Sequence, residues 1–138
     1  MENIEEIKKE ILACERLYYF GVCILKETRI LKKILADLSK ISLKIVYTLT
    51  KEKEIKDEKS RINFFIKNFA IKFFSKDEIN VFLNLIKFYK MHEKSSLEFV
   101  RKEKLIVYYN GKYETITKES IVNGINTLKL LVKKISGK

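Results

Sequence analysis

The chain contains no proline and no tryptophan, and only four of its 138 residues are glycine. Glycine-rich phosphate-binding loops and dinucleotide-binding fingerprints require closely spaced glycines, and β-sandwiches require frequent turn residues. The composition therefore disfavours all three classes. Because proline, the strongest helix breaker, is absent, the sequence favours α-helices.

Cysteine and histidine are nearly as scarce. The two cysteines, Cys14 and Cys23, lie in a segment predicted to be helical, so their backbones are roughly 13 Å apart, a distance that no disulfide spans. These two cysteines and the single histidine, His92, cannot form a closed zinc site. We expect two buried, reduced thiols, no metal site and no cofactor.

Long apolar runs are missing as well. The longest run, Leu17–Leu25, has nine residues, whereas a helix that spans a bilayer needs about twenty. The first residues of the chain are acidic, where a secretory signal would be basic. We therefore expect a cytoplasmic protein without a membrane partner.

What the chain has in excess is positive charge. Its 29 lysines and arginines outnumber 18 acidic residues, which gives a formal net charge of +11, while 46% of the residues are hydrophobic. This content is too apolar for a disordered tail, and the length suits one domain. We expect a single helical domain over residues 1–138.

Apolar residues at three- and four-residue spacing predict the first two helices. One runs from about Asn3 to the low twenties and breaks within Gly21–Glu27. The other covers Leu31–Leu49, with Thr28 as its N-cap. The charged segment Lys51–Lys59 has almost nothing to bury and is predicted to be a loop.

Two more helices and a hairpin follow. The apolar spacing in Ile62–Phe73 predicts a third helix, and the capping box Ser75–Glu78 begins a fourth that reaches about His92. Residues 104–117 alternate around Asn110-Gly111, the signature of a β-hairpin. Thr117 then caps a last helix that ends at Ser136-Gly137. The predicted fold class is all-α: an up-and-down bundle of four to five helices with one β-hairpin, at about 104–117, inserted before the last helix.

The segment Phe64–Phe74 is apolar almost all round. One side of this helix suits the core of the bundle, and the other side needs separate cover. A membrane-surface helix would have this composition, but we favour a helix buried in the bundle on one side and in a homodimer on the other.

The residues from His92 to Lys102 form the most site-like segment of the sequence. His92 is the only imidazole available for acid–base chemistry or phosphate contact, although a surface histidine at a helix end explains it as well. Arg101 is able to clamp a phosphate, or else to pair with Glu98 or Glu103. His92 and Arg101 are therefore the catalytic candidates.

The segments Glu15–Tyr19 and His92–Lys102, with the helix order around them, resemble small archaeal proteins of the HEPN-like group. The resemblance implies a helical bundle, usually dimeric, and a nucleic-acid context in which many members are metal-independent ribonucleases. Their catalytic motif has an arginine separated from the histidine by four to six residues. Here Leu85, Ile86 and Lys87 occupy those positions, which argues against the same catalytic role.

The basic residues provide the second functional clue, because a cationic face attracts nucleic-acid phosphates. A lysine-rich composition that only maintains solubility is the competing interpretation. With 25 lysines and four arginines, binding would depend on phosphates and shape, because base-specific contacts favour arginine. Residues 60–76 are also basic and contain no acid. The predicted nucleic-acid-binding residues are Lys26, Arg29, Lys32, Lys33, Lys40, Lys44, Arg101, Lys129, Lys133 and Lys134.

Together these features predict a homodimeric, non-catalytic module that binds nucleic acid, RNA in preference to DNA, or that forms a complex with a protein partner. One alternative is a metal-independent ribonuclease of the HEPN type. Another is a structural subunit that docks on a nucleotidyltransferase-like partner.

Overall fold

The computed structural model describes residues 2–27, 30–51, 53–94, 97–101, 104–109 and 111–136. Its helical elements are α1 (Glu2–Leu17), η1 (Tyr18–Ile24), α2 (Ile30–Thr50), α3 (Glu58–Phe65), η2 (Ile66–Ala70), α4 (Ile71–Phe73), α5 (Lys76–Lys94) and α6 (Lys118–Ser136), of which η1 and η2 are π-helical continuations of α1 and α3. The strands are β1 (Leu97–Arg101), β2 (Lys104–Tyr109) and β3 (Lys112–Ile116).

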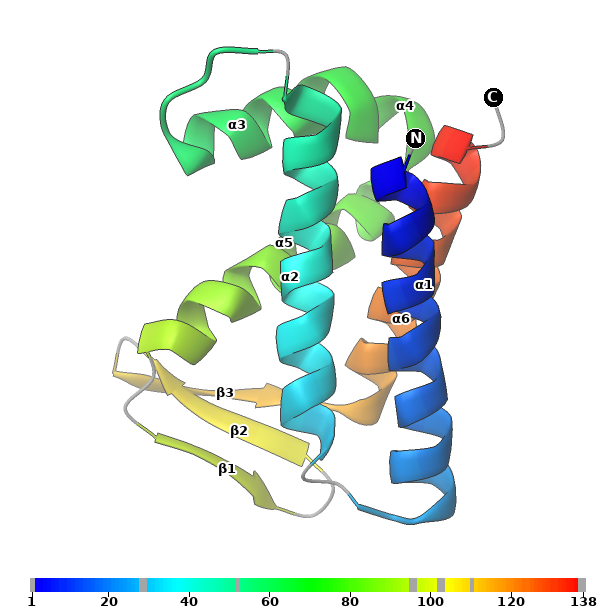
Figure 1. Cartoon of the computed structure of the whole chain (residues 1–138). Helices are drawn as coiled ribbons and strands as arrows, with labels where there is room; N and C mark the ends of the chain where they lie inside the picture. Colours follow the sequence, from blue (N-terminus) through cyan, green and yellow to red (C-terminus); the bar gives the residue numbers. More distant parts are fainter. Residues whose placement is uncertain are drawn as a thin grey trace.

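The helices form a bundle with a small sheet at one end. Helices α1, α2 and α6 run beside one another, while α3 and α5 cross α2 (Figure 1). The strands form an antiparallel sheet in the order β1-β2-β3, and β2 contacts α5. The predicted fold class, a helical bundle with a β-hairpin before the last helix, is confirmed.

The core consists of the apolar stripes that the spacing predicted. Ile7 of α1, Ile34 and Leu38 of α2 and Leu128 of α6 are completely buried. Each stripe lies on one face of its helix, so the helices bury these faces against one another. The bundle therefore has one shared core, which the first, second and last helices enclose together with α5.

Local sequence signals also mark the ends of helices. The Ser75 amide donates to the Glu78 carboxylate at 2.8 Å and the Glu78 amide donates to the Ser75 hydroxyl at 3.2 Å, as in a capping box. The Ser120 amide donates to the Thr117 hydroxyl at 3.2 Å at the start of α6. These two predicted caps are confirmed, whereas Thr28 lies outside the described residues.

The sheet has one more strand than the sequence analysis predicted. The hairpin of β2 and β3 turns at Gly111, whose φ of +74° suits glycine. The residues from Leu97 to Arg101, which lie between the predicted fourth helix and the predicted hairpin, form a further strand, β1, and pair with β2 from Tyr108 to Lys104. Pairing with β2 gives the backbone N–H and C=O groups of this segment hydrogen-bond partners that they would lack in an irregular connection.

The end of the first helix differs from the prediction. Cys14 is buried as expected, but Cys23 is exposed, so the prediction of two buried thiols is wrong for Cys23. The reason is the change to π-helical geometry at Tyr18, because hydrogen bonds from residue i to i+5 shift the angular position of every following side chain. Tyr19 and Phe20 are consequently exposed too.

The apolar segment Phe64–Phe74 finds most of its cover within the chain. Phe65 is completely buried and stacks on Phe69 and Phe82, with ring centroids 5.8 and 5.3 Å apart. Phe74 is also buried, and Ile71, 61% exposed, is the one large apolar side chain of this segment that lies uncovered. The argument for a dimer through this face therefore loses its basis, and the homodimer stays a prediction.

Within the described part of the chain, no helix combines the length and the apolar character that crossing a membrane requires.

Candidate functional site

The two catalytic candidates lie on neighbouring elements. His92 belongs to the last turn of α5, and Arg101 is the last residue of β1, paired with Lys104 of β2. Their side chains lie outside the described part of the structure, as does the whole of Arg29. Lys87, in one of the positions where the HEPN motif has arginine, is 4.0 Å from the Glu114 carboxylate.

Three of the predicted phosphate-binding lysines have acidic partners. The Lys44 ammonium lies 3.2 Å from Glu6 and 2.5 Å from Glu10, both on α1. Hydrogen bonding to Glu10 raises the pKa of Lys44. The Lys33 ammonium donates to the Asp37 carboxylate at 2.9 Å, and this hydrogen bond raises the pKa of Lys33. Lys129 pairs with Glu15 of α1 at 2.8 Å.

The pairs of Lys44 and Lys129 follow from the position of α1, which packs against both α2 and α6 (Figure 1), whereas the pair of Lys33 and Asp37 lies within α2. Its acids Glu6 and Glu10 lie next to α2, and Glu15 lies next to α6. A nearby carboxylate cancels much of the potential that an ammonium group presents to a phosphate. The predicted basic face over α2 and α6 is therefore partly neutralised by α1.

Other lysines of the predicted set have different surroundings. Lys26 and Lys40 are exposed and form no ion pair with described residues. Lys26 also has a positive φ of 59°, in the left-handed region. Lys134 donates to the carbonyl oxygen of Phe73, the last residue of α4. This contact places the end of α6 beside α4. Because a carbonyl oxygen carries no formal charge, the contact does not neutralise the Lys134 ammonium group.

The bundle end formed by η2, α4, the start of α5 and the last turns of α6 carries lysines that form no ion pair with described residues. Residues 59–76 contain Arg61 and four lysines but no acid, and acids resume only at Asp77 and at Glu78, which the capping box employs. The side chains in question are exposed and form no ion pair within the described residues. We call this surface the lysine end: Lys67, Lys72, Lys76, Lys133 and Lys134.

Arg61, in the same acid-free stretch, serves the fold instead. Its guanidinium donates to the carbonyl oxygens of Thr50, Lys53 and Ile55 at 2.8, 3.3 and 3.0 Å, and to the Thr50 hydroxyl at 2.9 Å. The same group lies over the Tyr47 ring, 4.9 Å from its centroid. These contacts cap the carboxyl end of α2, where carbonyl groups lack partners within the helix. They leave few guanidinium N–H groups of Arg61 available to bind a phosphate.

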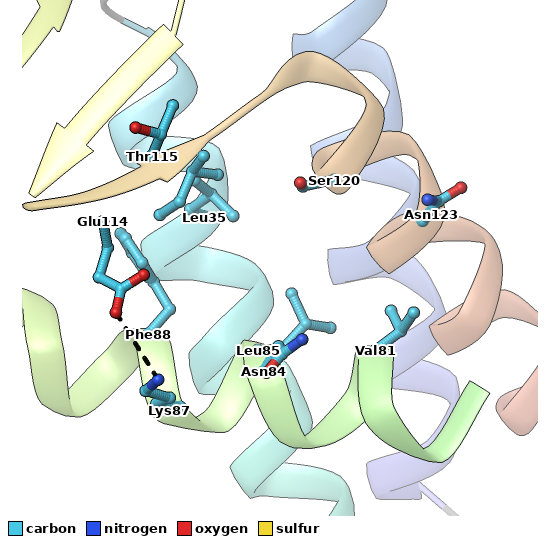
Figure 2. Close-up of a pocket in the computed structure, with 11 residues that line it drawn as sticks. Leu35, Val81, Asn84, Leu85, Lys87, Phe88, Glu114, Thr115, Ser120 and Asn123 are labelled. Atoms are coloured by element: carbon cyan, nitrogen blue, oxygen red, sulfur yellow. Dashed lines mark ion pairs between the residues drawn. The ribbon is translucent and has the colours of Figure 1, made fainter. Parts of the chain in front are cut away.

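A pocket of about 370 Å³ lies between α5, β3 and α6. Figure 2 shows Ser120 and Asn123 of α6 on one side and Asn84 of α5 on another, with the Lys87–Glu114 pair at the edge. The apolar floor includes Leu35, Leu85 and Phe88. Amides and hydroxyls over an apolar floor suit hydrogen bonding to a small polar molecule, and the lining residues that the structure describes include no imidazole and no thiol.

Among the described residues, no group of three histidine, cysteine or acidic side chains is placed to hold a metal ion. No protein-family profile, curated protein or solved structure matches the chain.

Proposed function

We propose that the chain is a non-catalytic nucleic-acid-binding module that contacts phosphates, those of RNA in preference to DNA, through the lysine end. The observation that carries the proposal is the difference in partners. Lys67, Lys72 and Lys76 are exposed and form no ion pair with described residues, whereas Lys33 and Lys44 hold carboxylates.

The chemistry of lysine defines the kind of binding. An ammonium group on a flexible stem neutralises a phosphate as a point charge, without the planar fork that reads a base edge. The one arginine in this stretch, Arg61, is occupied by backbone carbonyls. We therefore expect binding that depends on phosphates and shape and that varies little with sequence.

The test is the salt dependence of RNA binding. If the five lysines of the lysine end engage about five phosphates, log affinity falls with log salt at a slope of about −3.5 for a single strand and about −4.5 for a duplex. Between about 50 and 200 mM salt, the affinity then falls about 10² to 10³-fold. A flat response would overturn the proposal and favour a structural subunit that docks on a protein partner.

A metal-independent ribonuclease of the HEPN type is the second candidate, which the resemblance around His92 favours. Lys87, at one position of the family's arginine, is paired with Glu114. We expect metal-free incubation with mixed RNA to give no cleavage above background, for the native chain and for His92→Ala alike. Cleavage by the native chain that is lost in His92→Ala would establish the ribonuclease.

A further inference from the structure

The far end of the first helix exposes an unusual amount of apolar surface. The exposed fractions are 56% for Tyr19, 57% for Phe20, 51% for Ile24 and 72% for Leu25. We call these four residues the apolar tip. Isolated exposed apolar residues are ordinary, but a cluster of four in seven positions marks an interaction surface.

The tip is held in place by the rest of the chain. Gly21 and Val22, between the exposed residues, are buried. A Cβ atom at Gly21 would lie 2.6 Å from the terminal methyl of Ile30, so the glycine permits close contact with the start of α2. The Leu25 amide donates to the Phe20 carbonyl at 3.0 Å. The four side chains are therefore presented by a packed and hydrogen-bonded turn.

The tip carries no net charge, unlike the rest of the molecule. Residues 17–25 contain no charged side chain, and the flanking Glu15, Arg16, Lys26 and Glu27 sum to zero on a chain with a net charge of +11. A surface that binds an anionic membrane would be surrounded by cationic residues, and one that binds a strongly charged protein would carry the opposite charge. A second copy of this chain also has a net charge of +11, so most of the surface repels it. At the apolar tip it meets no net repulsion.

We infer that the apolar tip is the interface of a two-fold homodimer. Aromatic side chains bring about 150 to 250 Å² each, so four half-exposed apolar side chains offer on the order of 400 Å² per copy and about 800 Å² per dimer. Specific interfaces bury about 1,200 Å² or more, which the flanking charged residues complete as a rim. The mixed charges of that rim can pair across the two-fold axis.

Such a dimer has a consequence for the proposed function, on which this step rests. The helix formed by α1 and η1 runs from beside the last turns of α6, where Lys134 contacts α4, to the tip, over a length of roughly 30 Å. Joining two copies at their tips places their lysine ends at opposite ends of the dimer. The dimer would then bridge two nucleic-acid segments.

Sedimentation equilibrium without nucleic acid tests the interface. We expect a dimer with a Kd in the micromolar range, weakened at least about tenfold in the double variant Phe20→Ser/Leu25→Ser. Ile71→Ser is the matched control, because Ile71 is 61% exposed but lies in α4 at the lysine end. A monomer at about 100 µM, or a dimer that the double variant leaves unchanged, would overturn the inference.

Cys23 provides an independent readout. Its thiol is exposed within the tip, whereas burial raises the pKa of Cys14 to about 12 and keeps that thiol unreactive. Each thiolate adds across one ring of a short bismaleimide, and the ring carbon takes a proton from water. We expect a cross-linked dimer from the native chain and none from Cys23→Ser. Absence of the native cross-link would contradict a tip-to-tip contact.

Bridging is tested with two RNAs, one biotinylated and one fluorescent, which have no complementarity. The native chain should retain the fluorescent RNA on a streptavidin surface, and Phe20→Ser/Leu25→Ser should bind each RNA but retain much less. If sedimentation shows the dimer and neither RNA binds, the proposed function fails and the interface stands. If both RNAs bind and the double variant bridges equally well, the bridging step is wrong.

Discussion

Lys44 and Lys72 carry the same ammonium group, but their surroundings differ. Lys44 lies between two carboxylates of α1, while Lys72 is exposed on α4 and forms no ion pair with described residues. The same contrast separates Lys33 and Lys129 from the lysine end. Net charge therefore does not locate an interface, because packing decides which charges remain available to a ligand.

The largest effect on stability is expected at the basic residue with the most internal partners. Arg61→Ala removes hydrogen bonds to three carbonyl oxygens that close the carboxyl end of α2. We predict a loss of about 2 to 3 kcal/mol in the free energy of unfolding, measured by urea denaturation. The RNA-binding slope of the folded variant should stay unchanged.

Arg16→Ala is the control for that variant, since Arg16 is exposed and forms no ion pair with described residues. It should change the free energy of unfolding by less than about 0.5 kcal/mol. Equal effects of the two substitutions would mean that Arg61 contributes nothing beyond its charge.

Lys26 offers a second test of the comparison, because it is exposed like the lysine end but follows η1, at the far end of the first helix from the N-terminus of α1. Its φ of 59° is one that glycine adopts without strain. We predict that Lys26→Gly raises the free energy of unfolding by about 1 kcal/mol. It should leave the salt slope of RNA binding unchanged, and a lower slope would return Lys26 to the interface.

Lys44→Ala should have a smaller effect. The Lys44 side chain is 41% exposed, and surface ion pairs are worth between 0 and about 1 kcal/mol. Because the pKa of Lys44 is raised above the unfolded value of 10.5, its contribution is present at neutral pH and is lost as the pH rises above 10.5. Urea denaturation of both chains should show a smaller difference at pH 11 than at pH 7. A difference that is equally large at the two pH values would contradict the ion pair.

Much of the fold could be predicted because its signals are local. The capping box at Ser75–Glu78 and the turn at Gly111 depend on neighbours within a few residues. Strand β1 was not predicted because Leu97–Arg101 forms a strand only through its hydrogen bonds to β2, and its own residues carry no signal for them. The exposure of Cys23 was missed because apolar spacing assumes α-helical geometry throughout, and η1 departs from it.

The site was harder to predict than the fold. The pairing of Lys44 with Glu10 joins residues 34 positions apart, and the spacing of charges in a sequence does not reveal which helix faces meet. The absence of acids between residues 59 and 76 was visible in the sequence. That these residues share one surface with Lys133 and Lys134 could be seen only in the structure, where the contact of Lys134 with Phe73 places the end of α6 beside α4.

The most direct measurement compares the salt dependence of RNA binding for two double variants of equal charge. Lys67→Ala/Lys72→Ala should lower the magnitude of the single-strand slope by about 1.4 and weaken binding about 25-fold at about 0.1 M salt, because two phosphate contacts are lost. Lys33→Ala/Lys44→Ala should leave the slope nearly unchanged, since these lysines already hold carboxylates. Equal slopes for the two variants, or a larger loss in Lys33→Ala/Lys44→Ala, would contradict the lysine end as the nucleic-acid interface.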